Sequence, residues 1–184
     1  MKKIQIIGFS GSGKSTLAGI LAERLSLPVL YLDTVYWLPG WKERSREEQS
    51  EILGKFLADH PDGWVIDGNY RKNHYDERME EADRIIFMNF NRWCCLWRIL
   101  KRRVMYAGKT RASITEGCDE KVDWPFIKWA FWDSRRPEVL ARYYNNKERW
   151  PEKFVELKKP REVKRFLESI GSMEPLSRRS GKNG

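Results

Sequence analysis

Cysteine, histidine and long apolar runs are all scarce in this chain. Its 184 residues include three cysteines and two histidines. Because Cys94 and Cys95 are adjacent and Cys118 stands apart, their spacing gives neither a disulfide framework nor a zinc site, and we expect free thiols in a cytoplasmic protein. The first apolar run breaks at Gly8, too early for a membrane span or a signal peptide. We therefore expect no membrane partner.

Acidic residues are also in deficit. The chain has 26 Asp and Glu against 35 Lys and Arg, which gives a formal net charge of +9. Such a charge suits an enzyme that acts on polyanionic substrates, and it equally suits non-specific attraction to nucleic acid. No helix-turn-helix, zinc finger or aromatic-basic RNA motif is visible, so a nucleic-acid partner has no motif to support it. The length predicts one domain, and both a monomer and a homodimer stay open.

A glycine-rich stretch near the start of the chain matches the phosphate-binding pattern G-x-x-x-x-G-K-[ST]. This glycine loop consists of Gly8, Phe9, Ser10, Gly11, Ser12, Gly13, Lys14, Ser15 and Thr16. A β-branched run at 4–7 precedes it and an apolar helical period at 17–25 follows it, so the loop joins a strand to a helix. In that setting, main-chain N–H groups and the positive end of the helix attract phosphate. Lys14 would reach the β- and γ-phosphates, Ser15 would bind Mg²⁺, and Thr16 would add a phosphate contact.

Strands and helices are expected to alternate along the rest of the chain. Apolar runs predict four more strands, at 29–32, 64–66, 85–90 and 154–157. Helical periods lie between them and after the last of them, at 47–60, 93–106, 125–144 and 161–170. This alternation predicts an α/β fold with a parallel sheet. Ligands of such sheets bind beyond the carboxyl ends of the strands, so one site should collect Gly8, Asp33, Asp67 and Asn91.

Asp33 and Asp67 are the candidate acids of that site. Nucleotide-bound Mg²⁺ usually takes a carboxylate, directly or through water. We assign Asp67 to magnesium together with Ser15, and Asp33 to the acceptor of the phosphoryl group. A base is needed there if the acceptor is a hydroxyl and not if it is a phosphate oxygen. The alternative is that each Asp only forms a turn, which strand ends favour anyway.

Arginines supply the candidate cations. The segment 91–115 contains no acid, and Arg98 and Arg102, four residues apart within it, point from one helix face. Cations on a mobile segment suit closure over a migrating phosphoryl group, although a solvated basic face explains the run as well.

Aromatic residues and the turn after the last strand supply the ligand contacts that remain. Tyr36, Trp37 and Trp41 suit stacking on an acceptor ring, and they equally suit packing in the core. The main chain at Lys159 and Pro160 suits the edge of an adenine.

Four segments together resemble the adenylate-kinase-like branch of P-loop kinases. They are the glycine loop at 8–16, Asp67-Gly68-Asn69-Tyr70-Arg71, the run from Arg98 to Val104, and Lys159-Pro160. More narrowly, Leu32-Asp33, Tyr36-Trp37, Pro39-Gly40-Trp41 and the run from Trp64 to Tyr70 are similar to proteins named DNA topology modulation proteins (FlaR-related). The sequence departs from adenylate kinases at two places: Leu-Asp-Thr at 32–34 replaces Thr-Gly-Asp, and Asn69-Tyr70 replaces Phe-Pro.

This resemblance implies ATP and Mg²⁺ as cofactors, with Lys14 and the loop binding ATP. Arg71 would face the acceptor's phosphate. Arg98 and Arg102 would contact the nucleotide and the transferring phosphate, and Arg135 or Arg136 would do the same from across a lid. The departures leave the AMP pocket unreproduced, and an acid at Asp33 resembles kinases of hydroxyl-bearing small molecules instead.

The expectation is a three-layer P-loop NTPase fold whose five-stranded parallel sheet has the order 2-3-1-4-5. One kinase-like domain would span 1–171, with a helical lid at about 105–135 and a disordered basic tail at 172–184. The expected function is an ATP- and Mg-dependent phosphotransferase acting on a nucleotide or a hydroxylated metabolite. The alternatives are a nucleotide-dependent, DNA-associated regulatory protein and a plain NTPase.

Overall fold

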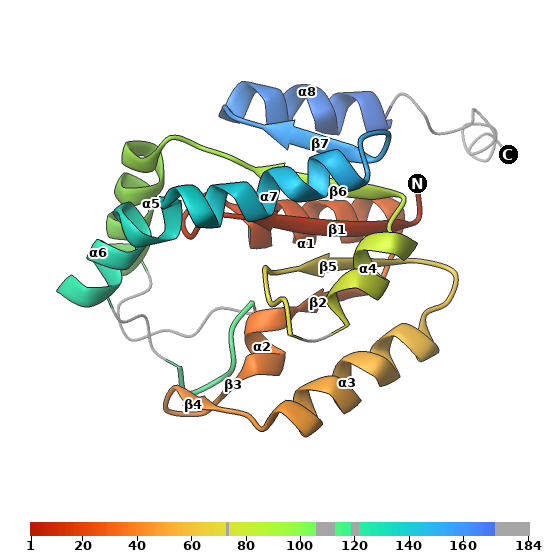
Figure 1. Ribbon diagram of the computed structural model, residues 1–184, viewed down its shortest axis with the longest axis horizontal. Helices are drawn as coiled ribbons and strands as arrows, with labels where there is room; N and C mark the ends of the chain where they lie inside the picture. Colours follow the sequence, from red (N-terminus) through yellow and green to blue (C-terminus); the bar gives the residue numbers. More distant parts are fainter. Residues whose placement is uncertain (73, 106–112, 119–121, 172–184) are drawn as a thin grey trace, which may run out of the picture.

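Five parallel strands form the central sheet of the protein, whose computed structural model describes residues 1–72, 74–105, 113–118 and 122–171 (Figure 1). The strands are β1 (Lys3–Gly8), β2 (Val29–Tyr31), β5 (Trp64–Asp67), β6 (Arg84–Met88) and β7 (Phe154–Leu157). They pair in the order β2-β5-β1-β6-β7, all parallel. The predicted α/β class and the five-stranded parallel sheet are confirmed.

Helices cover both faces of this sheet. On one face lie α1 (Lys14–Leu25) and α8 (Pro160–Gly171), which are joined where Arg24 donates to the carbonyl of Leu167 at 3.0 Å. On the other face lie α4 (Tyr75–Glu81) and α7 (Pro137–Arg149), which are joined where the Asn146 amide donates to the Tyr75 hydroxyl at 2.7 Å. Figure 1 shows α7 in front of the sheet and α1 behind it. The result is three layers.

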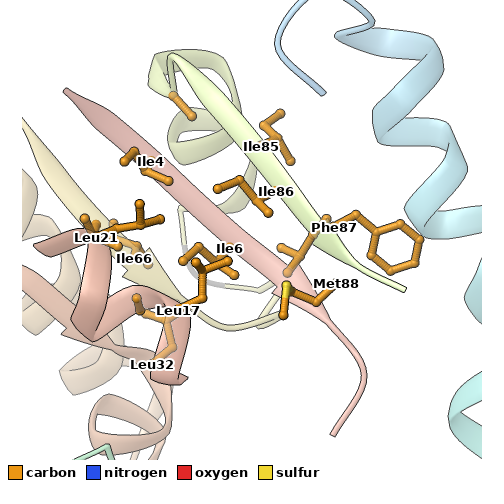
Figure 2. Packing of buried hydrophobic residues seen from close by; sticks show 14 of the residues in the cluster. Ile4, Ile6, Leu17, Leu21, Leu32, Ile66, Ile85, Ile86, Phe87 and Met88 are labelled. Atoms are coloured by element: carbon orange, nitrogen blue, oxygen red, sulfur yellow. The ribbon is translucent and has the colours of Figure 1, made fainter. Parts of the chain in front are cut away.

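The core is built from strand residues that are buried on both faces. Ile4, Ile6 and Ile7 of β1 are at most 1% exposed, as expected for a central parallel strand. Figure 2 shows Leu17 and Leu21 of α1 gathered with Ile6 and Ile66. On the other face, the Phe87 ring stacks on Tyr143 of α7 at 4.4 Å. This packing holds the helices against the sheet and so positions the carboxyl ends of its strands.

The remaining elements other than α3 gather at the edge where the strands end, and α3 runs back from it toward the start of β5 (Figure 1). After β2 come α2 (Leu32–Tyr36), the hairpin of β3 (Trp37–Leu38) and β4 (Lys42–Glu43), and α3 (Arg46–Asp59). After β6 come α5 (Arg92–Met105), α6 (Trp124–Phe131) and the 3-10 turn η1 (Asp133–Arg135). Neither α2, the hairpin nor α4 was predicted, because elements of two to seven residues leave little periodicity. No helix among the described residues is long and apolar enough to cross a membrane.

Two predicted segments lie partly or wholly outside the described residues. The expected lid at about 105–135 includes residues 106–112 and 119–121, and the expected tail at 172–184 lies wholly outside. Within the described part of the lid, residues 113–118 touch the β3–β4 hairpin. The N–H of Gly40 donates to the Gly117 carbonyl at 3.0 Å, and the Thr115 hydroxyl donates to the carbonyl of Trp37.

Candidate functional site

The glycine loop turns sharply between β1 and α1. Gly8, Gly11 and Gly13 have φ of 144°, 75° and 94°, values that side chains disfavour. A Cβ on Gly11 would lie 2.5 Å from the carbonyl oxygen of Cys95 and 2.8 Å from Ile99. The loop therefore needs glycine both for its backbone angles and for its close approach to α5.

Asn69 and Arg98 hold the loop from two sides. The Asn69 side chain accepts from the Gly8 N–H at 2.8 Å and donates to the Gly8 carbonyl at 2.6 Å. Arg98 donates to the Ser12 carbonyl at 2.8 Å while its guanidinium covers the Phe90 ring. Charged and amide donors of this kind fix carbonyl directions. The loop's N–H groups are thus oriented by residues from β5's end and from α5.

A buried polar pair holds the backbone of the segment after β5, which contains Asn69. Gln5 and Arg78 are both 0% exposed, and Arg78 donates to the Gln5 side-chain oxygen at 2.6 Å. Gln5 donates in turn to the Gly68 carbonyl, and Arg78 donates to that of Tyr70. Burial lowers the pKa of Arg78 to about 10. The pair pins the backbone on both sides of Asn69.

Ser15 and Asp67 form the candidate magnesium ligands. The Ser15 hydroxyl donates to Asp67 at 2.6 Å, and the carboxylate is 5% exposed at the end of β5. A hydroxyl and a carboxylate are the oxygen donors that Mg²⁺ takes beside phosphates. Lys14 lies next to them, and its ammonium donates to the Phe9 carbonyl at 3.1 Å, across its own loop. The residues present therefore fit a magnesium-bound phosphate group.

A cavity of about 1270 Å³ opens from the loop. Sites for one drug-sized ligand occupy roughly 300–1,000 Å³, so this one has room for two reactants. Its two ends lie at opposite edges of the sheet, since α8 follows β7 and α2 follows β2. The α8 end is lined by Ile20, Arg24, Pro160, Val163, Lys164, Leu167 and Glu168. The α2 end is lined by Asp33, Tyr36, Trp37, Trp41, Tyr70 and Ile114. Between the two ends, α5 and α6 add Arg98, Lys101, Arg102, Met105, Asp123, Phe126 and Trp129 to the lining.

Asp33 is the carboxylate of the α2 end. One of its oxygens accepts from the Tyr70 hydroxyl at 2.7 Å, and the Tyr70 ring stacks on Tyr36 at 4.6 Å. Burial, and then the charge of Asp33, raises the pKa of Tyr70 well above its ordinary value. Burial and a bond to Glu43 raise that of Tyr36 to about 12. Tyr70 therefore keeps its proton and stays a donor to Asp33.

Comparison with known proteins gives two partial likenesses. No family model matches the chain. The chain is 29% identical over 143 residues to an uncharacterized protein of Bacillus subtilis, YqaC, which covers 77% of this chain and 78% of that protein. It is also 34% identical over 74 residues to the pentafunctional AROM polypeptide of Schizosaccharomyces pombe, which covers 34% of this chain and spans 5% of that polypeptide. Neither likeness establishes a family.

Most of the predicted site residues lie together in the cavity. It is lined by Ser10, Gly11, Ser12, Gly13, Lys14, Ser15, Thr16, Asp33, Tyr36, Trp37, Asp67, Arg98, Arg102 and Pro160. Gly8 lies behind the loop, where a Cβ would meet Met88. Lys159 is absent from the lining although Pro160 is part of it.

Three predicted arginines lie elsewhere. Arg135 packs behind the loop, with its guanidinium 3.8 Å from the centre of the Phe9 ring and a bond to the Phe90 carbonyl. Arg136 is exposed and pairs with Asp133 at 2.6 Å. Arg71 is exposed and covers the Tyr75 ring. The η1 turn directs Arg135 into the core and Arg136 outward, which sequence spacing alone does not reveal.

Asn69, Gln5 and Arg78 are the functional supports that sequence reasoning missed. A glutamine inside a β-branched strand was a visible signal, because a buried amide needs partners. Arg78 gave no such signal, since it lies in a short helix rich in exposed charges.

Proposed function

We propose that the protein is an ATP- and Mg-dependent phosphotransferase that moves the γ-phosphoryl group to a small acceptor. The observation that carries this proposal is the shared cavity, in which Lys14, Ser15 and Asp67 lie at the glycine loop and Asp33 lies toward the α2 end. The strand order supports the P-loop class, because counting the five strands along the chain gives 2-3-1-4-5.

The chain's own residues divide the work. The loop N–H groups and Lys14 would bind the phosphates, with Lys14 exchanging the Phe9 carbonyl for phosphate oxygens. Ser15 and Asp67 would hold Mg²⁺, which when bound neutralises charge on the phosphate oxygens. Arg98 and Arg102 would neutralise charge on the migrating group from α5. Asp33 would accept the proton of the attacking hydroxyl.

The test is ATP consumption in Mg²⁺ against a panel of nucleotides and hydroxylated metabolites. We expect one class of acceptor to raise turnover above the reaction with water. Arg98→Ala should lower kcat/KM about 100-fold, because a fixed cation at the transferring group is lost. Arg136→Ala is the matched control and should stay within about twofold, because its exposed ion pair contributes little.

Failure would take a definite form. If no acceptor raises ATP turnover, the transferase assignment is wrong and a plain NTPase is left. If Arg98→Ala and Arg136→Ala lose activity equally while both stay folded, α5 does not face the transferring phosphate.

A further inference from the structure

The α2 end of the cavity differs from the α8 end in the charges that line it. Its described lining, from α2, the hairpin, the segment after β5 and Ile114, carries one carboxylate, Asp33, and no cation. Arg24, Lys164 and Glu168 belong to the α8 end, and Lys14 lies at the loop. The other lining cations, Arg98, Lys101 and Arg102, come from α5, whose Arg98 bonds the loop itself.

Three arginines lie near the α2 end without lining the cavity, and the charge of one of them, Arg46, acts to lower the pKa of Tyr36, which burial raises. Arg44 donates to the Val35 carbonyl at 3.0 Å, and Arg71 covers the Tyr75 ring. An acceptor that carries its own phosphate needs fixed cations or N–H groups around it. The carboxylate of Asp33 in their place would repel it. The α2 end therefore favours an acceptor without a phosphate.

Aromatic rings make up the wall of the α2 end. Tyr36 stacks on Tyr70 at an interplanar angle of 29°, Trp37 meets Tyr36 edge-on at 4.8 Å, and Trp41 meets Trp37 edge-on at 5.4 Å. All four rings are half-buried and line the cavity. Faces of such rings bind flat molecules well.

The backbone of Trp41 is an independent sign of function. It has φ of 63° in the three-residue loop of the β3–β4 hairpin, directly after Gly40 at 77°. A bulky residue rarely adopts this left-handed region, and such outliers cluster at ligand sites. Glycine or asparagine would suit the turn better. Trp41 thus presents a ring to the cavity at the expense of backbone strain.

Asp33 supplies the chemistry beside this wall. Tyr70 occupies its Oδ1, and Oδ2 has no hydrogen bond to any described residue. Oδ2 is therefore the oxygen available to a ligand's hydroxyl.

We propose, on the basis of the phosphotransferase function above, that the acceptor is an unphosphorylated molecule with a planar ring and a hydroxyl group. The ring stacks against the wall of Tyr36, Trp37 and Trp41, and the hydroxyl donates to Asp33. The hydroxyl oxygen bonds to the γ-phosphorus, the bond from that phosphorus to the β–γ bridging oxygen breaks, ADP leaves, and the proton passes to Asp33. Nucleosides and other hydroxylated aromatic compounds share this chemistry.

The first experiment measures ADP release from Mg-ATP with matched acceptors. One arm uses nucleosides, a second uses their 5′-monophosphates, and a third uses hydroxylated aromatic compounds without a sugar. We expect the first or third arm to exceed the second at least tenfold in kcat/KM. Monophosphates that match or exceed nucleosides would overturn the inference and leave the phosphotransferase function standing. ATP turnover that no arm raises, with Mg-ATP binding intact, would overturn both.

The second experiment separates ligand stacking from a structural role. Trp41→Asn, which suits the turn, should raise the acceptor KM about tenfold and leave the ATP KM within twofold. Trp41→Phe should restore most of the acceptor affinity, because it keeps a ring. Trp97→Asn, at an exposed tryptophan outside the cavity, is the control and should change neither KM. An acceptor KM unchanged in Trp41→Asn would remove the stacking wall from the proposal.

Discussion

The two halves of the cavity are built in different ways. At the glycine loop, side chains bind main-chain atoms: Asn69 holds Gly8 through two hydrogen bonds, and Arg98 holds Ser12. At the α2 end, half-buried rings contact one another on elements of two to five residues. Fixed backbone suits a phosphate, whose shape never changes. A wall of rings offers flat apolar faces instead of fixed main-chain donors.

The largest expected effect tests the glycine-loop half of the cavity. Lys14→Ala should lower phosphoryl transfer about 100- to 1,000-fold, since it removes the loop cation that we propose to bind the β- and γ-phosphates. Calorimetry with Mg-ATP should show the same variant binding weakly. Lys55→Ala, in an exposed i,i+4 pair with Asp59 on α3, is the control and should behave as wild type. Unchanged Mg-ATP affinity in Lys14→Ala would show that the glycine loop does not bind the nucleotide through Lys14.

Two glycines with nearly equal φ compare the halves directly. Gly11 at 75° faces the Cys95 carbonyl, whereas Gly40 at 77° in the hairpin faces open space. Gly40→Ala should cost about 1 kcal/mol of unfolding free energy, the cost of placing a side chain in the left-handed region. Gly11→Ala should cost about 1–3 kcal/mol more, because backbone must move. Urea unfolding measures both, and equal losses would mean that the loop yields as easily as the hairpin.

The geometry of the glycine-loop half could be predicted from sequence alone, because the information for it is local. The glycine loop, the strand before it and the helix after it all lie within residues 3–25. The acids at Asp33 and Asp67 followed from a rule about strand ends. The main sheet followed from near-continuous apolar runs, since strands buried on both faces show little else.

The α2 half could not be predicted in the same way. Its wall joins residues of α2, the hairpin and the segment after β5, and the packing of Tyr36 on Tyr70 spans 34 positions. The contacts of the two arginines were equally unpredictable. Arg135 and Arg136 are neighbours in sequence, yet Arg135 bonds the Phe90 carbonyl while Arg136 pairs with Asp133. Tertiary packing decided these orientations, and no periodicity encodes them.

Asn69→Ala tests how the backbone of the glycine-loop half is held in place. It leaves the Gly8 N–H and carbonyl without their side-chain partner, which should cost about 1–3 kcal/mol of unfolding free energy. Asn145→Ala, at an exposed position on α7, should change stability by less than about 0.5 kcal/mol. If Asn69→Ala is equally mild in thermal unfolding, the loop does not depend on its clamp.

The smallest expected effect is an alkaline loss of stability specific to the α2 half. The pKa of Tyr70 is raised in the folded protein above its ordinary value of 10.0, so its contribution is present below pH 10 and lost as the pH rises past it. Wild type should therefore lose about 1 kcal/mol more than Tyr70→Phe between pH 9 and roughly pH 11. Gly40→Ala should run parallel to wild type, because Gly40 faces open space and bonds no titratable side chain. Denaturant unfolding at stepped pH measures the slopes, and coincident slopes for wild type and Tyr70→Phe would show that neither burial nor Asp33 holds the phenol proton.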